Sequence, residues 1–359
     1  MAMKKPQRAE DRAAVEKARA RGALLGLAVG DALGAPVKGK RLQAPPHPKL
    51  ADGPYRDMSG GGVLALKPGQ VTDETQMATC IAASLRALKS YDPPDVWKRY
   101  LAWRNNAFEV TLHTQQAFQA HLEGGLSAQN PARHVWRESG RKAASNNSLA
   151  RTAPIGVYFA KDPEARAKAS LADSALTHYD ARCQLACVAL NGAIAAAISG
   201  PTDRPPKPEE LVDGATLGLS LGGALLGKQT PEIVQETQVA SELWRKELER
   251  ARQPDPMLYG PDLHLHSDRD RESVQVAFRI AWWELFHAGS FEAALLDVVN
   301  RGGDADANAA VTGALLGAFY GEAAIPDRWK KPVLEALSMS RSQLWETYHP
   351  RHLITLTEG

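Results

Sequence analysis

The sequence predicts an all-α fold. Apolar residues recur at the spacing of a helix over residues 75–88, 183–199 and 273–288, whereas runs of alternating β-branched residues are nearly absent. Segments rich in Pro, Gly and Asp separate the helical stretches near 44–54, 91–95 and 200–210. Because 359 residues can bury a substantial core, we expect most of these helices to form one compact domain.

In chain order, residues 1–20 form a charged N-terminal arm, whose Ala, Arg and Glu content is typical of a solvated helix. The domain follows over residues 21–325. Its stretches at 22–36 and 214–227 hold several glycines, although each costs about 1 kcal/mol in a helix interior relative to alanine. This density predicts helices whose backbones cross very close together. Residues 326–359 are expected to form a C-terminal helical extension that packs on the domain.

The most apolar stretch, residues 186–200, is shorter than the ~20 residues that cross a bilayer, so we interpret it as a core helix. Of the three cysteines, Cys183 and Cys187 would share one face of this helix as small buried side chains, rather than form a zinc or redox site. A sparse, odd cysteine count is typical of a reducing cytoplasm. The charged N-terminus also lacks the apolar run of a signal peptide. We therefore expect a cytoplasmic protein.

The charge of the chain is nearly balanced, with 43 Lys and Arg against 41 Asp and Glu. A formal net charge of +2 creates no overall field that would attract nucleic acid or an anionic membrane. Neither is expected as a partner, and we expect a monomer. Any anionic ligand must be bound by local groups.

Two acidic clusters stand at the starts of predicted helices. In the stretch NRGGDADANAA, Gly302 and Gly303 lead into Asp304 and Asp306. A single carboxylate is enough to cap a helix, so the second one needs another partner.

The second cluster, in VTDETQ, consists of Thr72, Asp73 and Glu74. Here Asp73 and Gln76 have the spacing of a capping box, which is the ordinary structural interpretation. However, each cluster supplies more carboxylates than a cap requires. Carboxylate, hydroxyl and backbone oxygens are the ligands of Mg²⁺, Mn²⁺ and Ca²⁺, and two facing clusters could hold two ions about 3.5–4 Å apart.

A further acid, Asp31, lies inside the apolar stretch GLAVGDALGAP. A lone buried carboxylate is costly, so it should have a hydrogen-bond partner or a metal ion. A supporting or capping role and direct ligation of a metal both remain open at this point.

Five motifs follow one another in a distinctive order: GALLGLAVGDALGAP, VTDETQ, SNNSLARTAPIG, THYDARC and NRGGDADANAAVTGALLGAFYG. Over residues 20–325 the sequence thereby resembles the ADP-ribosylglycohydrolase family, which includes the dinitrogenase reductase-activating glycohydrolases and the animal ADP-ribosyl-acceptor hydrolases. Each motif is modest alone, and their order and spacing make the resemblance specific.

The resemblance implies a compact all-α hydrolase with two divalent cations, Mg²⁺ or alternatively Mn²⁺, in a cleft. Such an enzyme cleaves the bond between ADP-ribose and a modified side chain or small acceptor, by attack of a metal-oriented water on the anomeric carbon. The metal motifs of the family fall on Thr72, Asp73 and Glu74, and on Asp304 and Asp306. Of these, Asp73 and Glu74 are the expected catalytic residues, which steer the proton of the water.

The resemblance also implies residues that bind ADP-ribose. The turn Asn146, Asn147 and Ser148 lies where family members wrap the diphosphate. His178 and Asp180 match a motif beside the same ligand, although a lone histidine is more often structural. Glu109 lies where relatives that act on ADP-ribosyl-arginine have an acid, which can accept two N–H bonds from a guanidinium group. The remaining expected ligand contacts are Asp31, Gly302 and Gly303.

Four residues depart from the family pattern. Lys38 stands where many relatives have a glutamate, and Ala307 replaces a Thr or Ser that helps to coordinate one ion. Glu74 in place of Asp keeps the carboxylate, whereas Asn147 in place of Gly matters if its φ is positive.

These departures leave three hypotheses. The first is an ADP-ribosyl hydrolase. The second is a catalytically weakened protein that binds ADP-ribose or neutralises a toxin as an immunity factor. The third is a purely structural relative, and the retained acids Asp73, Asp304 and Asp306 argue against it.

Overall fold

The computed structural model describes residues 5–40, 52–124, 131–229, 231–253, 265, 271–337 and 343–358. In these ranges the chain is helical, and pairing between extended segments is limited to two isolated bridges, Gly61 with Leu66 and Ser145 with Ser273. The all-α prediction is therefore confirmed.

The helices of the first half are α1 (Lys5–Gly34), η1 (Ala35–Val37), α2 (Asp73–Leu88), α3 (Pro93–Arg104), α4 (Leu112–Glu123), α5 (Pro131–Glu138), α6 (Asn147–Arg151), α7 (Ala153–Tyr158) and α8 (Pro163–Thr177). Those of the second half are α9 (Ala181–Ser199), α10 (Pro208–Gln229), η3 (Pro231–Ile233), α11 (Val234–Ala251), α12 (Val274–His287), α13 (Phe291–Asn300), α14 (Ala305–Tyr320), η5 (Glu322–Ala324), α15 (Asp327–Glu335), α16 (Gln343–Thr347), α17 (Pro350–Ile354) and η6 (Thr355–Thr357).

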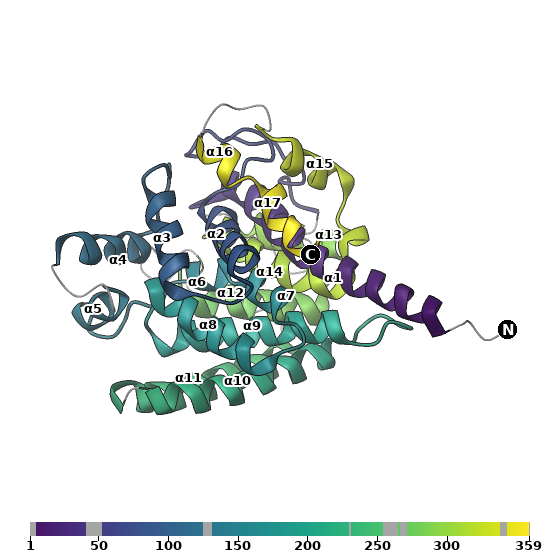
Figure 1. Ribbon diagram of the computed structural model, residues 1–359. Coiled ribbons are helices and arrows are strands. Elements are labelled where there is room, and N and C mark those ends of the chain that lie inside the picture. The colour runs from purple at the N-terminus through teal and green to yellow at the C-terminus, as the bar shows by residue number, and fades with distance from the viewer. Residues whose placement is uncertain are drawn as a thin grey trace.

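The centre of the fold is the contact between α1 and α14, which lie side by side (Figure 1). A side chain on any of four α1 glycines would overlap the α14 backbone, and the pairs are Gly22 with Gly317, Gly26 with Gly313, Gly30 with Ala309, and Gly34 with Ala305. The order of these pairs makes the helices antiparallel, and their four-residue spacing keeps one face of each helix in contact. The close crossing predicted from the glycines is present here.

This antiparallel contact positions the acidic residues. The last turn of α1 carries Asp31, and it lies against the first turn of α14, which carries Asp306. Two acids that are far apart in the sequence are therefore brought to the same end of the helix pair.

The helix α9 packs against α1 and α14 on one side and against α10 and α11 on the other (Figure 1). Among the described helices, it is the one long and apolar enough to cross a membrane, but 89% of that stretch is buried inside the protein. Cys183 and Cys187 lie on α9 as free, fully buried thiols. The interpretations of this segment as a core helix and of its cysteines as buried small side chains are confirmed.

The two chain ends differ in their packing. α1 is continuous through residue 20; residues 9–14 are exposed, and the N-terminal turns extend away from the body (Figure 1). At the other end, α15 and α17 contact α1, and the buried Trp329 donates its indole N–H to the carbonyl of Arg56 at 2.9 Å. Residues 1–4 of the expected arm, and residues 338–342 and 359 of the expected extension, lie outside the described part.

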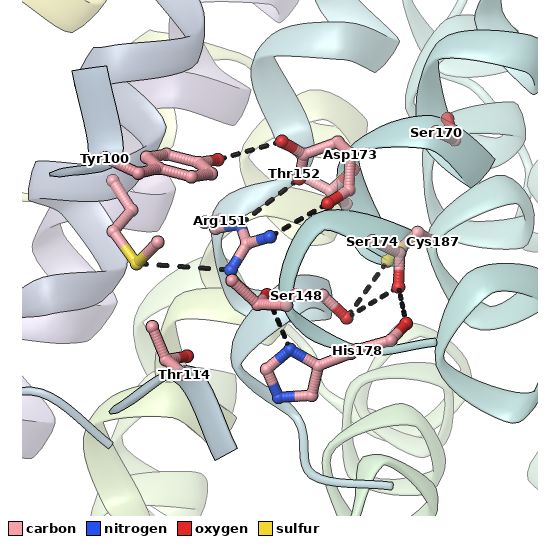
Figure 2. A network of polar contacts seen from close by, with 12 residues as sticks. Tyr100, Thr114, Ser148, Arg151, Thr152, Ser170, Asp173, Ser174, His178 and Cys187 are labelled. Carbon is pink, nitrogen blue, oxygen red and sulfur yellow. Dashed lines mark hydrogen bonds and ion pairs between the residues drawn. The ribbon is translucent and has the colours of Figure 1, made fainter. Parts of the chain in front are cut away.

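A buried ion pair anchors the short helix α6. The guanidinium of Arg151 contacts the carboxylate of Asp173 on α8 at 3.1 Å, and both side chains are fully buried (Figure 2). The hydroxyls of Tyr100 and Tyr91 donate to the other carboxylate oxygen at 2.8 and 3.1 Å. Because the Asp173 oxygens have donors on every side, the buried charge is compensated.

Hydroxyl and amide groups continue this network along α6. Ser174 donates to the hydroxyl of Ser148 at 3.0 Å (Figure 2). The amide of Asn191 donates to the hydroxyl of Thr152 at 2.8 Å. These hydrogen bonds fix the segment from Asn147 to Thr152 to α8 and α9. They thereby set the position of Asn146, which directly precedes this segment.

Replacing Gly26 by alanine is expected to lower the free energy of unfolding by about 1–3 kcal/mol or more, because the methyl group would overlap the carbonyl of Gly313. Urea denaturation measures the change. The control is Gly227→Ala in α10, where no atom lies within 4 Å of an added Cβ. That variant should be unchanged or up to about 1 kcal/mol more stable. Equal effects of the two substitutions would contradict the close crossing.

Replacing Asp173 by leucine is expected to cost about 3–5 kcal/mol, because the Arg151 charge stays buried without its partner. The double variant Asp173→Leu, Arg151→Met should recover part of this loss. Urea denaturation of the two single variants and the double variant gives the coupling energy. Strictly additive losses would show that the pair does not act as a unit.

Candidate functional site

The starts of α2 and α14 meet in one acidic cluster. Asp73 and Glu74 lie in the first turn of α2, Asp304 and Asp306 lie at the start of α14, and all four side chains are buried. Their charges act on one another across the two helices: burial raises the pKa of Asp73, and Asp306 raises it further. Burial, Asp73 and Asp306 likewise raise the pKa of Glu74 well above its usual value. The structure thus brings together residues more than two hundred positions apart.

At the starts of α2 and α14, the N-cap side chain accepts no capping hydrogen bond from the helix backbone. Asp304 occupies the N-cap position of α14, but its side chain accepts no capping hydrogen bond. The alternative of a capping box at α2 is wrong, because the N-cap is Thr72 and Asp73 is already helical. The amide of Gln76 instead donates to the carbonyl of Val71 at 3.2 Å and accepts from the indole of Trp103 at 2.7 Å.

The carboxylate of Asp31 holds the start of α2. It accepts from the backbone N–H of Thr72 at 3.0 Å and of Thr75 at 3.1 Å, and from both threonine hydroxyls, at 2.6 and 2.5 Å. These four groups account for both oxygens, so the contacts favour the supporting role for Asp31 over direct ligation. Burial raises the pKa of Asp31 to about 7, against the lowering effect of the threonine hydrogen bonds.

The hydroxyl of Thr72 lies between two carboxyl groups, 2.6 Å from Asp31 and 2.7 Å from Oε2 of Glu74. A hydroxyl has one proton to donate, so only one of these carboxylates receives it at a time. Burial and the neighbouring acids raise the pKa of Glu74, whose Oε1 has no donor in the described part of the chain.

The strongest indication of a ligand is a set of buried oxygens without donors. Both carboxylate oxygens of Asp73 and Oε1 of Glu74 have no hydrogen-bond partner in the described part of the chain. Buried polar atoms are rarely left unpaired unless an ion or water completes the site. A divalent cation would both bind these oxygens and offset the repulsion among the acids. The chemistry of these oxygens suits a hard metal ion, although in the part of the chain that the structure describes no group of three or more His, Cys, Asp and Glu side chains has the arrangement of a formed metal site.

Lys38 reaches into the same cluster. Its ammonium lies 2.6 Å from Oε1 of Glu109 and 2.9 Å from Oδ2 of Asp306. Burial alone would lower the pKa of Lys38, but the surrounding carboxylates, Asp306 foremost, raise it well above the usual value. The ammonium thus stays charged and neutralises part of the cluster.

Two glycines hold Lys38 in place. Gly39 donates its N–H to the carbonyl of Gly303 at 2.7 Å, and Gly303 donates to the carbonyl of Lys40 at 3.0 Å. Gly302 and Gly303 both have positive φ, 71° and 66°, a conformation that favours glycine. Of these two glycines, both predicted to bind ligand, Gly303 makes the contacts that hold the segment around Lys38, whereas Gly302 donates its N–H to the carbonyl of Val299 at 3.1 Å.

A pocket of about 550 Å³ opens beside the cluster. It is lined by Lys38, Glu109, Thr111, Leu112, His113, Lys142, Ala144, Ser145, Arg182, Arg271, Glu272 and Ser273. On its wall, Oε2 of Glu109 is buried and has no hydrogen-bond partner among the described residues. Burial and Asp73 raise the pKa of Glu109 to about 7, against the opposing effect of Lys38. The pocket therefore joins a basic rim to the acidic cluster.

Asn146 and Asn147 lie at the junction of this cluster with α6. The amide of Asn146 donates to Oδ2 of Asp304 at 2.7 Å, whereas its Oδ1 and the Nδ2 of Asn147 are buried without partners. Asn147 is not among the described residues with positive φ. Asparagine in place of glycine therefore introduces no backbone strain here.

Three predicted ligand residues make other contacts. His178 is buried, with Nε2 bonded to the hydroxyl of Ser145 at 2.7 Å and Nδ1 bonded to Thr177 at 2.8 Å. Asp180 is the N-cap of α9, where its carboxylate accepts from the backbone of Arg182 at 2.9 Å. The hydroxyl of Ser148 faces the core network (Figure 2). Each of these side chains thus contributes to holding the fold, and their place beside ADP-ribose stays a prediction.

Sequence reasoning missed three polar residues of this region. His113 and Ser145 line the pocket, and Nδ1 of His113 lies 2.8 Å from the hydroxyl of Ser145. Asn308 is buried, and neither polar atom of its amide has a hydrogen-bond partner within the described ranges. Its position four residues after Asp304, on the same helix face, was a usable signal, and Ser145 directly precedes Asn146. The sequence around His113 contains no pattern that indicated a place in the pocket.

The chain is similar to known proteins over most of its length. A family model described as ADP-ribosylglycohydrolase matches residues 12–356. The ADP-ribosyl-[dinitrogen reductase] glycohydrolase of Rhodospirillum rubrum is 27% identical over 318 residues, which cover 87% of this chain and 88% of the relative. The ADP-ribosylarginine hydrolase Tri1 of Serratia proteamaculans is 26% identical over 320 residues, which cover 87% and 74% of the two chains.

A solved structure, described as an ADP-ribosylglycohydrolase-related protein complex, matches with a TM-score of 0.64 and 27% identity. The match covers 96% of this chain and 98% of that one. With the family model covering nearly the whole length, the chain belongs to the ADP-ribosylglycohydrolase family, whose members are enzymes that hydrolyse ADP-ribose linkages.

Proposed function

We propose that this protein removes ADP-ribose from a modified protein side chain, with arginine as the favoured acceptor, in a reaction that depends on divalent cations. The observation that carries the proposal is the set of buried, donorless oxygens of Asp73 and Glu74 beside the 550 Å³ pocket. One relative is named for an ADP-ribosylarginine substrate and another for ADP-ribosyl-dinitrogen reductase. Both names support a modified protein as the substrate.

The residues that would hold the cations are Thr72, Asp73 and Glu74 from α2, and Asp304 and Asp306 from α14. Mg²⁺ suits this all-oxygen set best, and Mn²⁺ is the alternative. The family resemblance implies two such ions. A bound divalent ion supplies a water of lowered pKa at neutral pH and stabilises negative charge that develops in the transition state.

The acids of α2 are suited to moving the proton of the attacking water. Asp73 has both oxygens free of donors, and the raised pKa of Glu74 makes it a stronger base than an ordinary glutamate. Asp31 and Thr72 hold this turn in place through their hydrogen bonds. The reacting groups thus stand on a rigid helix start rather than on a loop.

Glu109 is suited to binding the acceptor. Its free Oε2 lies on the pocket wall and can accept an N–H from a guanidinium group, as a charge-assisted hydrogen bond. Its Oε1 is held by Lys38, which orients the carboxylate. This geometry supports arginine as the acceptor.

A second candidate function is binding of ADP-ribose, or neutralisation of a toxin partner, without turnover. The observation in its favour is the Lys38 ammonium paired to Asp306, which adds positive charge where catalytic cations are proposed. Calorimetry with ADP-ribose, alongside the hydrolysis assay, separates the two functions. Tight binding without any release from the full range of acceptors would favour the second.

The direct test is release of ADP-ribose from an ADP-ribosylated arginine protein, with Mg²⁺ and with a chelator. We expect release that requires the metal. Small ADP-ribosylated acceptors and Mn²⁺ complete the set of conditions. Absence of turnover under all of them, at high enzyme concentration, would rule out the hydrolase.

Replacing Asp73 by asparagine is expected to lower kcat about 10²–10⁴-fold, because it removes a proton-accepting carboxylate with little change in shape. The same change should stabilise the metal-free protein, since one repelling buried charge disappears. Kinetics and urea denaturation measure the two effects. Asp213→Asn, on the exposed side of α10, is the matched control and should change neither quantity. Loss of both activity and stability would indicate a structural role.

Replacing Glu109 by glutamine should lower kcat/KM for an ADP-ribosyl-arginine substrate about 10–100-fold, because a charge-assisted hydrogen bond contributes about 1.5–3 kcal/mol. Hydrolysis of an O-linked ADP-ribosyl acceptor should be little affected. Steady-state kinetics on both substrates gives the ratio, with the exposed Glu138→Gln as control. An equal loss on both substrates would contradict recognition of the acceptor by Glu109.

A further inference from the structure

The oxygens of the acidic cluster are unequally supplied with partners. On the α14 side, Oδ1 of Asp306 accepts from the N–H of Ala307 at 3.0 Å, and its Oδ2 contacts the Lys38 ammonium at 2.9 Å. Oδ2 of Asp304 accepts from Asn146. The next residue of α14, Ala307, is fully buried and offers no side-chain oxygen. On this side, three of the four carboxylate oxygens of Asp304 and Asp306 thus have a partner, and the buried side-chain oxygen without one in the described part of the chain is the neutral amide oxygen of Asn308.

The α2 side shows the opposite. Both oxygens of Asp73 and Oε1 of Glu74 are buried, and no donor contacts them from the residues that the structure describes. A divalent cation is attracted most strongly to carboxylate oxygens that no other group compensates. The carboxylate oxygens that no positive group or donor compensates thus lie mainly at the start of α2.

The ammonium of Lys38 is also hard to displace. Its turn is fixed by the backbone hydrogen bonds between Gly39, Gly303 and Lys40. At the other end, Glu109 holds the ammonium at 2.6 Å, and the side chain is only 16% exposed. An ion bound to Oδ2 of Asp306 would lie next to this fixed positive charge, and the two would repel each other strongly in a buried site.

We propose that the Lys38 ammonium acts as a built-in cation on the α14 side of the cluster, so that the site takes one divalent ion, on the α2 side, rather than two. The inference rests on the metal dependence proposed above and refines the number of ions. Lys38 and Ala307 would then be related features of one site. Lys38 supplies the positive charge on the α14 side, and without a second ion there the site needs no side-chain ligand at position 307.

The test counts Mn²⁺ ions, as a probe of the divalent site, by calorimetry and by electron paramagnetic resonance of the full-length protein. The wild type should bind one tight ion with the spectrum of an isolated Mn²⁺. Lys38→Met removes the ammonium and keeps an apolar stem; it should bind two ions, and a pair about 3.5–4 Å apart is magnetically coupled. Lys38→Arg retains the charge and should bind one.

Lys40→Met is the control, because Lys40 lies two residues away and contacts Tyr55 rather than the cluster. It should bind one ion, as the wild type does. Circular dichroism verifies that each variant is folded, and Lys38→Gln replaces Lys38→Met if the latter does not fold.

Two tight ions in the wild type, or one ion in the folded Lys38→Met and Lys38→Gln variants, would overturn the inference on Lys38. Either result would leave the proposed hydrolase function unaffected. Failure of every protein to bind Mn²⁺ would overturn both this inference and the proposed metal dependence. The two proposals therefore fail in distinguishable ways.

Discussion

The site depends on the side-by-side packing of α1 and α14. Four glycines of α1 bring its backbone into contact with small residues of α14, and a larger side chain at any of them would push the helices apart. Because the helices are antiparallel, the end of α1 meets the start of α14. Asp31 then holds the start of α2 from the same place. A change in this crossing would move three helix ends at once.

The electrostatic consequence is a cluster of buried acids with too few donors. Burial disfavours the charged form of each carboxyl group, and the neighbouring carboxylates add to the effect. Natural proteins tolerate such a concentration of like charge where a cation or a reaction requires it. In this protein, Lys38 compensates the acids in part, at Asp306 and Glu109. The oxygens of Asp73 have no partner in the part of the chain that the structure describes.

A buried ion pair in the core also helps to fix the position of the acidic cluster. Arg151 and Asp173 form a fully buried pair whose remaining hydrogen-bonding capacity is used by tyrosine hydroxyls and backbone (Figure 2). This network fixes α6, and Asn146, immediately before α6, donates to Asp304. The position of the acidic cluster is thus secured both by close helix packing and by a satisfied polar network.

The sequence alone determined the helical class, the position of the main helices, the close crossing of glycine-rich segments and the family resemblance. These features follow from local periodicity, from the cost of glycine in helices and from the order of the motifs. It did not determine which contacts His178, Asp180 and Ser148 make within the fold, because motif position does not reveal the spatial neighbours of a side chain.

Only the tertiary structure decided how Asp31 is used, since its threonine partners are about forty positions away along the chain. The structure also showed that Lys38 reaches Asp306, which a substitution in a motif cannot reveal by itself. Pairing of charges depends on distances through space, and those distances are set by how α1, α2 and α14 pack together.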